Sequence, residues 1–226
     1  MPCHRGSTLS RALLSAVVAC LPAFNGMAAE QDRWEPAIAA MEAQDRESPP
    51  PENGILFVGS SSIRMWEVKQ SFPDLPVINR GFGGSQIADS VRYADRIVLP
   101  YRPRVIVFYA GDNDIAAGKT PEQVADDFKA FVGKVRDGLP RTRIVFIGIK
   151  PSIRRWAMVD KMREANRLIR ALAAEDERLE YVDVDAPMIG HDGKPRAELF
   201  RSDGLHLSAE GYRRWADLVR PHLKPE

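Results

Sequence analysis

Five short apolar runs, rich in β-branched residues, recur along the chain between longer stretches of mixed polarity. They are "ILFV" (55–58), "PVIN" (76–79), "RVIVFY" (104–109), "RIVFIGI" (143–149) and "LEYVDV" (179–184). Runs that stay apolar at consecutive positions are typical of strands that are buried on both faces of a sheet. The pattern therefore predicts five interior strands.

The stretches between these runs carry apolar residues at helical spacing. In the segment 120–139, Thr120 is placed to cap a helix, Pro121 fits its first turn and Gln123 completes a capping box. The predicted buried stripe of this helix consists of Val124, Phe128, Phe131 and Val135.

Similar stripes occur around residues 86–99, 157–174 and 208–220, and Ser208 is a suitable N-cap for the last. Strands that alternate with helices predict right-handed crossovers and an open parallel sheet with helices on both faces. The sequence shows no internal repeat, low-complexity block or linker that would divide this domain.

A separate helix is predicted ahead of the first strand. Trp34, Ile38 and Met41 lie on one side of it, and a "PPP" spacer follows at 49–51. We interpret this segment, residues 30–53, as a helix that packs onto the domain without contributing chemistry.

The start of the chain has the pattern of an export signal. Arg5 and Arg11 precede a short, continuously apolar stretch, and small residues follow up to Ala28 and Ala29. The stretch shows no helical stripe, which disfavours an amphipathic first helix of the domain, and it is too short to span a bilayer as a finished helix. We interpret residues 1–29 as a cleaved signal peptide, which predicts a periplasmic or secreted protein without a transmembrane helix in its mature chain.

Both cysteines, Cys3 and Cys20, lie inside this predicted signal peptide. A mature chain without them would have no disulfide, no thiol nucleophile and no thiolate metal site. "VVAC" (17–20) also resembles a bacterial lipoprotein box, so lipidation at Cys20 is an alternative to simple cleavage.

Charge adds little about partners. The 32 lysines and arginines nearly balance the 31 aspartates and glutamates. There is no basic field of the kind that nucleic acids require, and we expect no nucleic-acid partner.

Polar or glycine-rich clusters follow the predicted strands. They are "GSSS" (59–62), "NRGFGGS" (79–85), "GDND" (111–114) and, beyond the fifth strand, "SDGLH" (202–206). Ligands of open parallel sheets bind at the carboxyl ends of the strands, which is where these clusters would meet. Their shared position predicts a functional site.

Each cluster alone has a simpler explanation. "GSSS" is a plausible helix cap, and "GDND" is a plausible turn or calcium loop, although its next ligand position is Ala116. "GFGG" suits a loop or a phosphate cradle, but GxGxxG is incomplete and no P-loop lysine follows. His206 alone could be structural.

Together the clusters supply the parts of a serine hydrolase. A serine needs a base within hydrogen-bond reach and a third group that orients the base. Asp203 and His206 stand three residues apart, so one turn can place the carboxylate against the imidazole. The Ser61 N–H, a glycine N–H of the second cluster and the Asn113 amide are candidate donors to an oxyanion.

In order and spacing, the four clusters resemble the conserved blocks of the SGNH hydrolases, also called the GDSL esterase and lipase family. The likeness extends from about residue 54 to residue 220. It implies that Ser61 is the nucleophile and that Asp203 and His206 complete the catalytic triad. One departure is that Ser60 stands where the family's first block has aspartate.

The resemblance also implies an oxyanion hole made by Ser61, Gly84 and Asn113. Gly83 and Gly81 are alternatives to Gly84 as the glycine donor.

The implied fold is a flavodoxin-like three-layer α/β/α sandwich with a five-stranded parallel sheet, occupying residues 54–226. Members of the family need no cofactor and cleave esters of small acids, sugars or lipids, so no metal or cofactor is expected. The predicted function is an exported serine esterase that hydrolyses short-chain acyl esters, with acetyl as one candidate, on a small-molecule or glycan substrate. The short loops between predicted elements favour a shallow site over a lipid tunnel.

Three alternatives remain open. An acyl- or acetyltransferase acting on glycan hydroxyls would use the same residues, and product analysis with an acceptor alcohol would distinguish it. A lysophospholipase-type lipase would prefer longer acyl chains. A non-catalytic binding module would not need all four clusters.

The segment 150–158 follows the fourth predicted strand. Arg155 and Trp156 in this segment are candidate substrate-binding residues, with a plain surface loop as the alternative. The sequence leaves the oligomeric state open.

Overall fold

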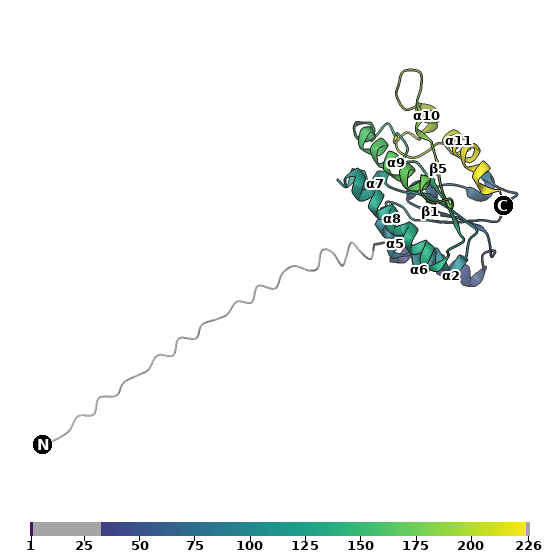
Figure 1. The fold of residues 1–226 in the computed structure, drawn as a ribbon, viewed down its shortest axis with the longest axis vertical. Coiled ribbons are helices and arrows are strands. Elements are labelled where there is room, and N and C mark those ends of the chain that lie inside the picture. The colour runs from purple at the N-terminus through teal and green to yellow at the C-terminus, as the bar shows by residue number, and fades with distance from the viewer. Residues whose placement is uncertain (2–32, 225–226) are drawn as a thin grey trace. The chain divides into compact units, whose positions relative to one another are not determined.

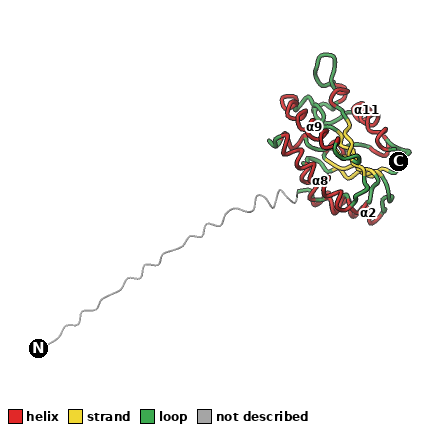
Figure 2. Tube along the Cα trace, viewed as in Figure 1, coloured by secondary structure: helices red, strands yellow, loops and turns green. Residues whose placement is uncertain are grey.

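The five apolar runs form the five strands of one parallel sheet, shown in yellow in Figure 2. The strands are β1 (Ile55–Gly59), β2 (Val77–Gly81), β3 (Val105–Tyr109), β4 (Arg143–Ile147) and β5 (Leu179–Val182). Their order across the sheet is β2-β1-β3-β4-β5, and every neighbouring pair is parallel. The predicted five-stranded parallel sheet is confirmed.

This computed structural model describes residue 1 and residues 33–224 (Figure 1). The compact unit that carries the sheet is Trp34–Glu226. Apart from Met1, the predicted signal peptide and its two cysteines lie outside the described residues. None of the helices in the described part of the chain has the length and apolar content needed to cross a membrane.

Side chains of each strand alternate between two separate hydrophobic cores. On β1, Leu56 and Val58 belong to one core, and Ile55 and Phe57 belong to the other. All four side chains are fully buried. Because both faces of the strand are covered, every position must be apolar, which explains the continuous runs.

Helices cover both faces of the sheet. The first core is covered by α2 (Glu35–Glu47), α5 (Ile87–Arg92), α6 (Ala94–Ile97), α7 (Asp112–Ala116), α8 (Pro121–Gly138) and α9 (Val159–Ala174). The second core is covered by α3 (Ser61–Arg64), α4 (Val68–Ser71), α10 (Asp185–Met188) and α11 (Ala209–Val219). Short 3₁₀ turns occur at Leu99–Tyr101, Trp156–Met158, Ala197–Leu199 and Arg220–Leu223. In Figure 1, α8 and α9 lie on one side of the strands and α11 lies on the other, as expected for a three-layer sandwich.

The helix-start signals read from the sequence are confirmed. Thr120 Oγ1 accepts a hydrogen bond from the Gln123 N–H at 3.3 Å and forms the predicted capping box. Ser208 Oγ accepts from the Gly211 N–H at 3.1 Å and starts α11. The stripe predicted on α8 is buried at all of its positions, which are Val124, Phe128, Phe131 and Val135.

The stripe at 86–99 differs from the expectation, since it is broken and does not form one helix. The break between α5 and α6 falls at Tyr93. The ring of Tyr93 is buried and meets Phe82 edge-on, with ring centroids 5.9 Å apart. Tertiary packing of this kind overrides a local helical pattern.

Helix α2 packs through the side that its sequence indicates. Trp34 and Ile38 are buried in the first core and Met41 packs against it. The Trp34 ring also meets Phe82 edge-on at 5.9 Å, and its Nε1–H donates to the Gly83 carbonyl at 2.9 Å. The helix therefore supports the glycine-rich loop that follows β2.

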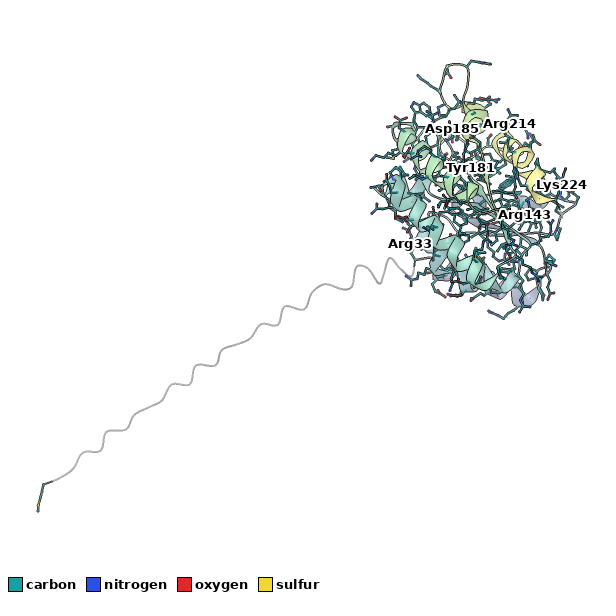
Figure 3. The ribbon with its side chains drawn as sticks, viewed as in Figure 1. Arg33, Arg143, Tyr181, Asp185, Arg214 and Lys224 are labelled. Atoms are coloured by element: carbon teal, nitrogen blue, oxygen red, sulfur yellow. The ribbon has the colours of Figure 1, made fainter. Side chains whose placement is uncertain are left out.

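The strand β5 forms one edge of the sheet, next to β4. Figure 3 labels Tyr181 of β5 and Arg143 of β4. The Tyr181 ring stacks on Phe146 with centroids 6.2 Å apart, and Arg143 Nε donates to Glu180 at 3.1 Å. Charged side chains on an edge strand protect it against pairing with other chains.

Candidate active site

The four polar clusters come together at the carboxyl edge of the sheet. Ser61 begins α3 just beyond β1, and Asn113 lies in the first turn of α7 beyond β3. Asp203 and His206 lie in the loop that leads into α11. Parallel strands align their carboxyl ends, so residues distant in sequence meet there.

A glycine makes the turn that presents Ser61. Gly59 has φ +140°, and a Cβ there would lie 1.9 Å from the Tyr109 carbonyl oxygen. Only glycine allows β1 to end this close to β3. Ser60 then stays extended, and Ser61 becomes the first residue of α3, where its N–H has no acceptor within the helix.

Ser61, His206 and Asp203 form one hydrogen-bonded series. The Ser61 Oγ lies 3.0 Å from His206 Nε2, and His206 Nδ1 lies 2.6 Å from Asp203 Oδ2. An ionised carboxylate can only accept a hydrogen bond, so Nδ1 carries the proton. In the neutral ring Nε2 is then an acceptor, and the serine hydroxyl donates to it.

Asp203 is held as a carboxylate by its contacts. Its Oδ1 accepts from the N–H groups of Leu205 and His206, both at 2.9 Å. The hydrogen bond from the His206 ring, followed by these backbone donors, holds the pKa of Asp203 well below its usual range. The carboxylate of Asp203 is therefore ionised at neutral pH.

The other two histidines of the described chain lie elsewhere. His222 Nδ1 pairs with Glu180 of β5, and His191 is exposed in a turn. Neither is placed to act on Ser61.

The Asn113 side chain is fixed by two contacts. Its Nδ2 donates to the Ser85 carbonyl at 2.9 Å, and its Oδ1 accepts from Arg155 Nη2 at 2.8 Å. An amide nitrogen carries two hydrogens, so one of them remains for another acceptor.

The glycine-rich loop after β2 contains the other predicted donor. Gly84 has φ +77°, a conformation that favours glycine. The Gly81 N–H donates to Asn79 Oδ1 at 2.9 Å, so it is already used within β2. Among the glycines considered from the sequence, this contact disfavours Gly81.

The neighbours of Ser61 have different surroundings. The Ser60 side chain is 1 % exposed, and in the described part of the chain its hydroxyl has no hydrogen-bond partner. The Ser62 hydroxyl accepts from Lys150 Nζ at 3.2 Å. Of the three serines, Ser61 alone contacts a histidine among the described residues.

A buried lysine beneath the site was not anticipated from the sequence. Lys150 is 1 % exposed and donates to Tyr109 Oη at 2.8 Å and Asp112 Oδ2 at 3.1 Å, besides Ser62. Burial lowers the pKa of Lys150, and the neighbouring Asp112 opposes this effect. The sequence offers one signal for it, since Lys150 directly follows the apolar run "RIVFIGI" (143–149). A charged group that is buried beyond the carboxyl end of a strand needs an oppositely charged or hydrogen-bonding partner.

The carboxylates of "GDND" face cations. Burial alone would raise the pKa of Asp112, but Lys150 and Arg155 outweigh it and hold that pKa below its usual value. Asp114 is fully buried, pairs with Lys119 at 3.0 Å and accepts from the Ile87 N–H. Within residues 33–224, no group of three or more His, Cys, Asp or Glu side chains is arranged to hold a metal ion.

Arg155 and Trp156, the candidate substrate-binding residues, lie beside the site in different ways. The Arg155 side chain is 16 % exposed, and its Nη1 lies 3.0 Å from Asp112 Oδ2. Trp156 is half-buried, with the Arg163 guanidinium 5.6 Å from its ring centroid. Their contact with a substrate stays a prediction.

A parallel five-stranded sheet between two helical layers, with these clusters at its carboxyl edge, is the fold of the SGNH hydrolases. The chain matches the model of the GDSL-like lipase/acylhydrolase family over residues 63–214 and belongs to this family. As a member of this family, the protein is a hydrolase that acts on esters.

The chain is also similar to individual proteins and solved structures. The chain is 29 % identical to the human platelet-activating factor acetylhydrolase IB subunit alpha1 over 168 residues, which is 71 % of each chain. A Streptococcus pneumonia structure named for platelet activating factor superposes with a TM-score of 0.76 and 23 % identity, covering 88 % of this chain and 100 % of the other. An acetyl esterase crystallised with acetate superposes with a TM-score of 0.59 and 17 % identity, covering 75 % and 95 %.

Proposed function

We propose that the protein is an exported serine esterase that hydrolyses short-chain acyl esters, acetyl esters first, through a Ser61-His206-Asp203 triad. The observation that carries the proposal is the continuous series from Ser61 Oγ through both ring nitrogens of His206 to Asp203. Export rests on the signal-like residues 1–29.

In the proposed mechanism, Ser61 Oγ attacks the ester carbonyl while His206 Nε2 takes its proton. Asp203 holds the ring in the productive tautomer and stabilises the imidazolium that forms. His206 then returns the proton to the leaving alcohol, and an acyl-enzyme remains on Ser61. Water, deprotonated by the same nitrogen, releases the acid in the second half of the reaction.

The developing oxyanion is assigned to three donors. The Ser61 N–H comes from the start of α3, the Gly84 N–H from the loop after β2, and the second hydrogen of Asn113 Nδ2 from α7. Donors held in place before the reaction need no reorganisation when charge appears, which is why such groups contribute strongly.

Two observations support a short acyl group. One residue separates β1 from α3, so the segment carrying Ser61 adds no insertion that could cover a long chain. The human relative is an acetylhydrolase, and one structural neighbour is an acetyl esterase.

The direct test is to label the purified protein with a fluorophosphonate and to measure hydrolysis of p-nitrophenyl esters from acetyl to palmitoyl. We expect labelling at Ser61 only, because His206 can deprotonate only that hydroxyl, and kcat/KM that is highest for acetyl and falls with chain length. Labelling at Ser60 or Ser62 would refute the assignment of the nucleophile. A maximum at palmitoyl would indicate a lipase, and acyl transfer to an added sugar alcohol in preference to water would indicate a transferase.

The proposed role of Asn113 as an oxyanion donor distinguishes this mechanism from that of a serine hydrolase with backbone donors only. We expect Asn113→Ala to reduce kcat by about 10²-fold to 10³-fold, or about 2.7 to 4 kcal/mol, with little change in KM. Asn113→Asp should be at least as harmful, because its carboxylate would oppose both the oxyanion and the Ser85 carbonyl. Steady-state kinetics on the acetyl ester measure both effects. Near-native kcat in both variants would reduce Asn113 to a turn residue.

A further inference from the structure

The usefulness of Asn113 as a donor depends on which way its amide faces. With Nδ2 toward the site, the group can donate to an oxyanion, whereas a flipped amide would present its oxygen and repel the charge. The two ends of the amide have nearly the same shape, so hydrogen-bond partners must decide the orientation.

Arg155 is the partner that discriminates between the two ends. A guanidinium only donates hydrogen bonds, and Arg155 Nη2 lies 2.8 Å from Asn113 Oδ1. A flipped amide would set two donors against each other there, and its oxygen would face the Ser85 carbonyl at the other end. The observed orientation is therefore enforced from both sides.

Arg155 is in turn held by buried charge. Its Nη1 lies 3.0 Å from Asp112 Oδ2, and the side chains of Arg155 and Asp112 are 16 % and 6 % exposed. Lys150 binds the same carboxylate oxygen at 3.1 Å. Planar guanidinium groups bridge two acceptors in a fixed geometry, which a flexible ammonium does not do.

The same cluster also reaches the nucleophile segment. Lys150 Nζ donates to Ser62 Oγ, next to Ser61, at 3.2 Å. The buried support of Arg155 is therefore tied to the start of α3.

We propose that Arg155 is a positioning residue that acts through Asn113, with Asp112 and Lys150 as its buried support, and that it does not bind the substrate. This inference rests on the proposed esterase function and reassigns a residue that the sequence suggested for substrate contact. Its Nη2 donates to Asn113 Oδ1 at 2.8 Å, and its Nη1 is buried against Asp112 Oδ2 at 3.0 Å in an ion pair without a hydrogen bond among the described residues.

The test compares Arg155→Met with Arg154→Met in the protein without its predicted signal peptide, and the substrate is p-nitrophenyl acetate. Arg154 is the exposed neighbour in the same loop, so its replacement removes the same charge without touching Asn113. We expect Arg155→Met to lower kcat by about 10-fold to 100-fold, less than loss of the donor itself, at unchanged KM. Arg154→Met should behave like the wild type.

A double-mutant cycle with Asn113→Ala identifies the route of the effect. If Arg155 acts through Asn113, Arg155→Met should cost almost nothing once Asn113 is alanine. A raised KM, or costs that multiply in the double variant, would show direct substrate binding and overturn the proposal. Unchanged kcat in Arg155→Met would overturn it too.

Arg155→Lys keeps a cation beside Asp112 and serves if the methionine variant does not fold. An ammonium group cannot bridge Asp112 and Asn113 as the planar guanidinium does, so kcat should stay reduced. A wild-type kcat in this variant would contradict the proposal. Failure of the underlying function looks different, because the wild-type protein itself would then be inactive and unlabelled at Ser61.

Discussion

Ser61→Ala is expected to lower kcat for acetyl esters by about 10⁶-fold. The residual activity would come from substrate binding and the oxyanion hole. The loss is expected because Ser61 Oγ is the atom 3.0 Å from His206 Nε2, and no acyl-enzyme forms without it. The variant should unfold as cooperatively as the wild type, since alanine is accepted at the first position of α3. Steady-state kinetics and thermal unfolding measure the two effects.

The neighbouring serine provides a matched control. Ser60→Ala removes the same atom one residue earlier, from a buried hydroxyl that has no hydrogen-bond partner in the described part of the chain. Its kcat should stay near the wild-type value, and stability should not fall, because no hydrogen bond is lost. If Ser60→Ala were inactive and Ser61→Ala active, the nucleophile would be misassigned by one residue.

Asp203→Asn is expected to reduce kcat by about 10⁴-fold, because it traps His206 in the wrong tautomer. The orientation of the new amide is dictated by the backbone, since the N–H groups of Leu205 and His206 at 2.9 Å require an acceptor. Its NH₂ must then face His206 Nδ1 and donate to it. The ring proton moves to Nε2, which can no longer accept the Ser61 proton.

The measurement is kcat across neutral pH, with Asp192→Asn as the control. Asp192 lies in an exposed turn, so its replacement changes the net charge equally and should leave kcat unchanged. A loss of only a few-fold in Asp203→Asn would mean that the carboxylate supports the loop and does not orient the base.

Local sequence determined much of the scaffold and of the site. The runs at 55–58 and 104–109 favoured strands, because short runs of consecutive apolar and β-branched residues suit a strand that is covered on both faces. The capping box at Thr120 and the N-cap at Ser208 involve residues within one helical turn. These helix starts can therefore be predicted from the sequence alone. The spacing of Asp203 and His206 is equally local, and the structure places their side chains 2.6 Å apart.

Tertiary structure alone decided the features that depend on residues far apart in the chain. The break at Tyr93 follows packing on Phe82, and the orientation of the Asn113 amide follows from Arg155, which lies 42 residues later. Lys150 contacts Ser62 across a separation of 88 residues. A hydrogen bond or a buried ion pair needs its partner within about 3 Å, and only the crossover connections of the sheet bring these partners that close. For that reason the sequence predicted which residues at the strand ends form the site. It did not predict the buried charged side chains that hold those residues in place.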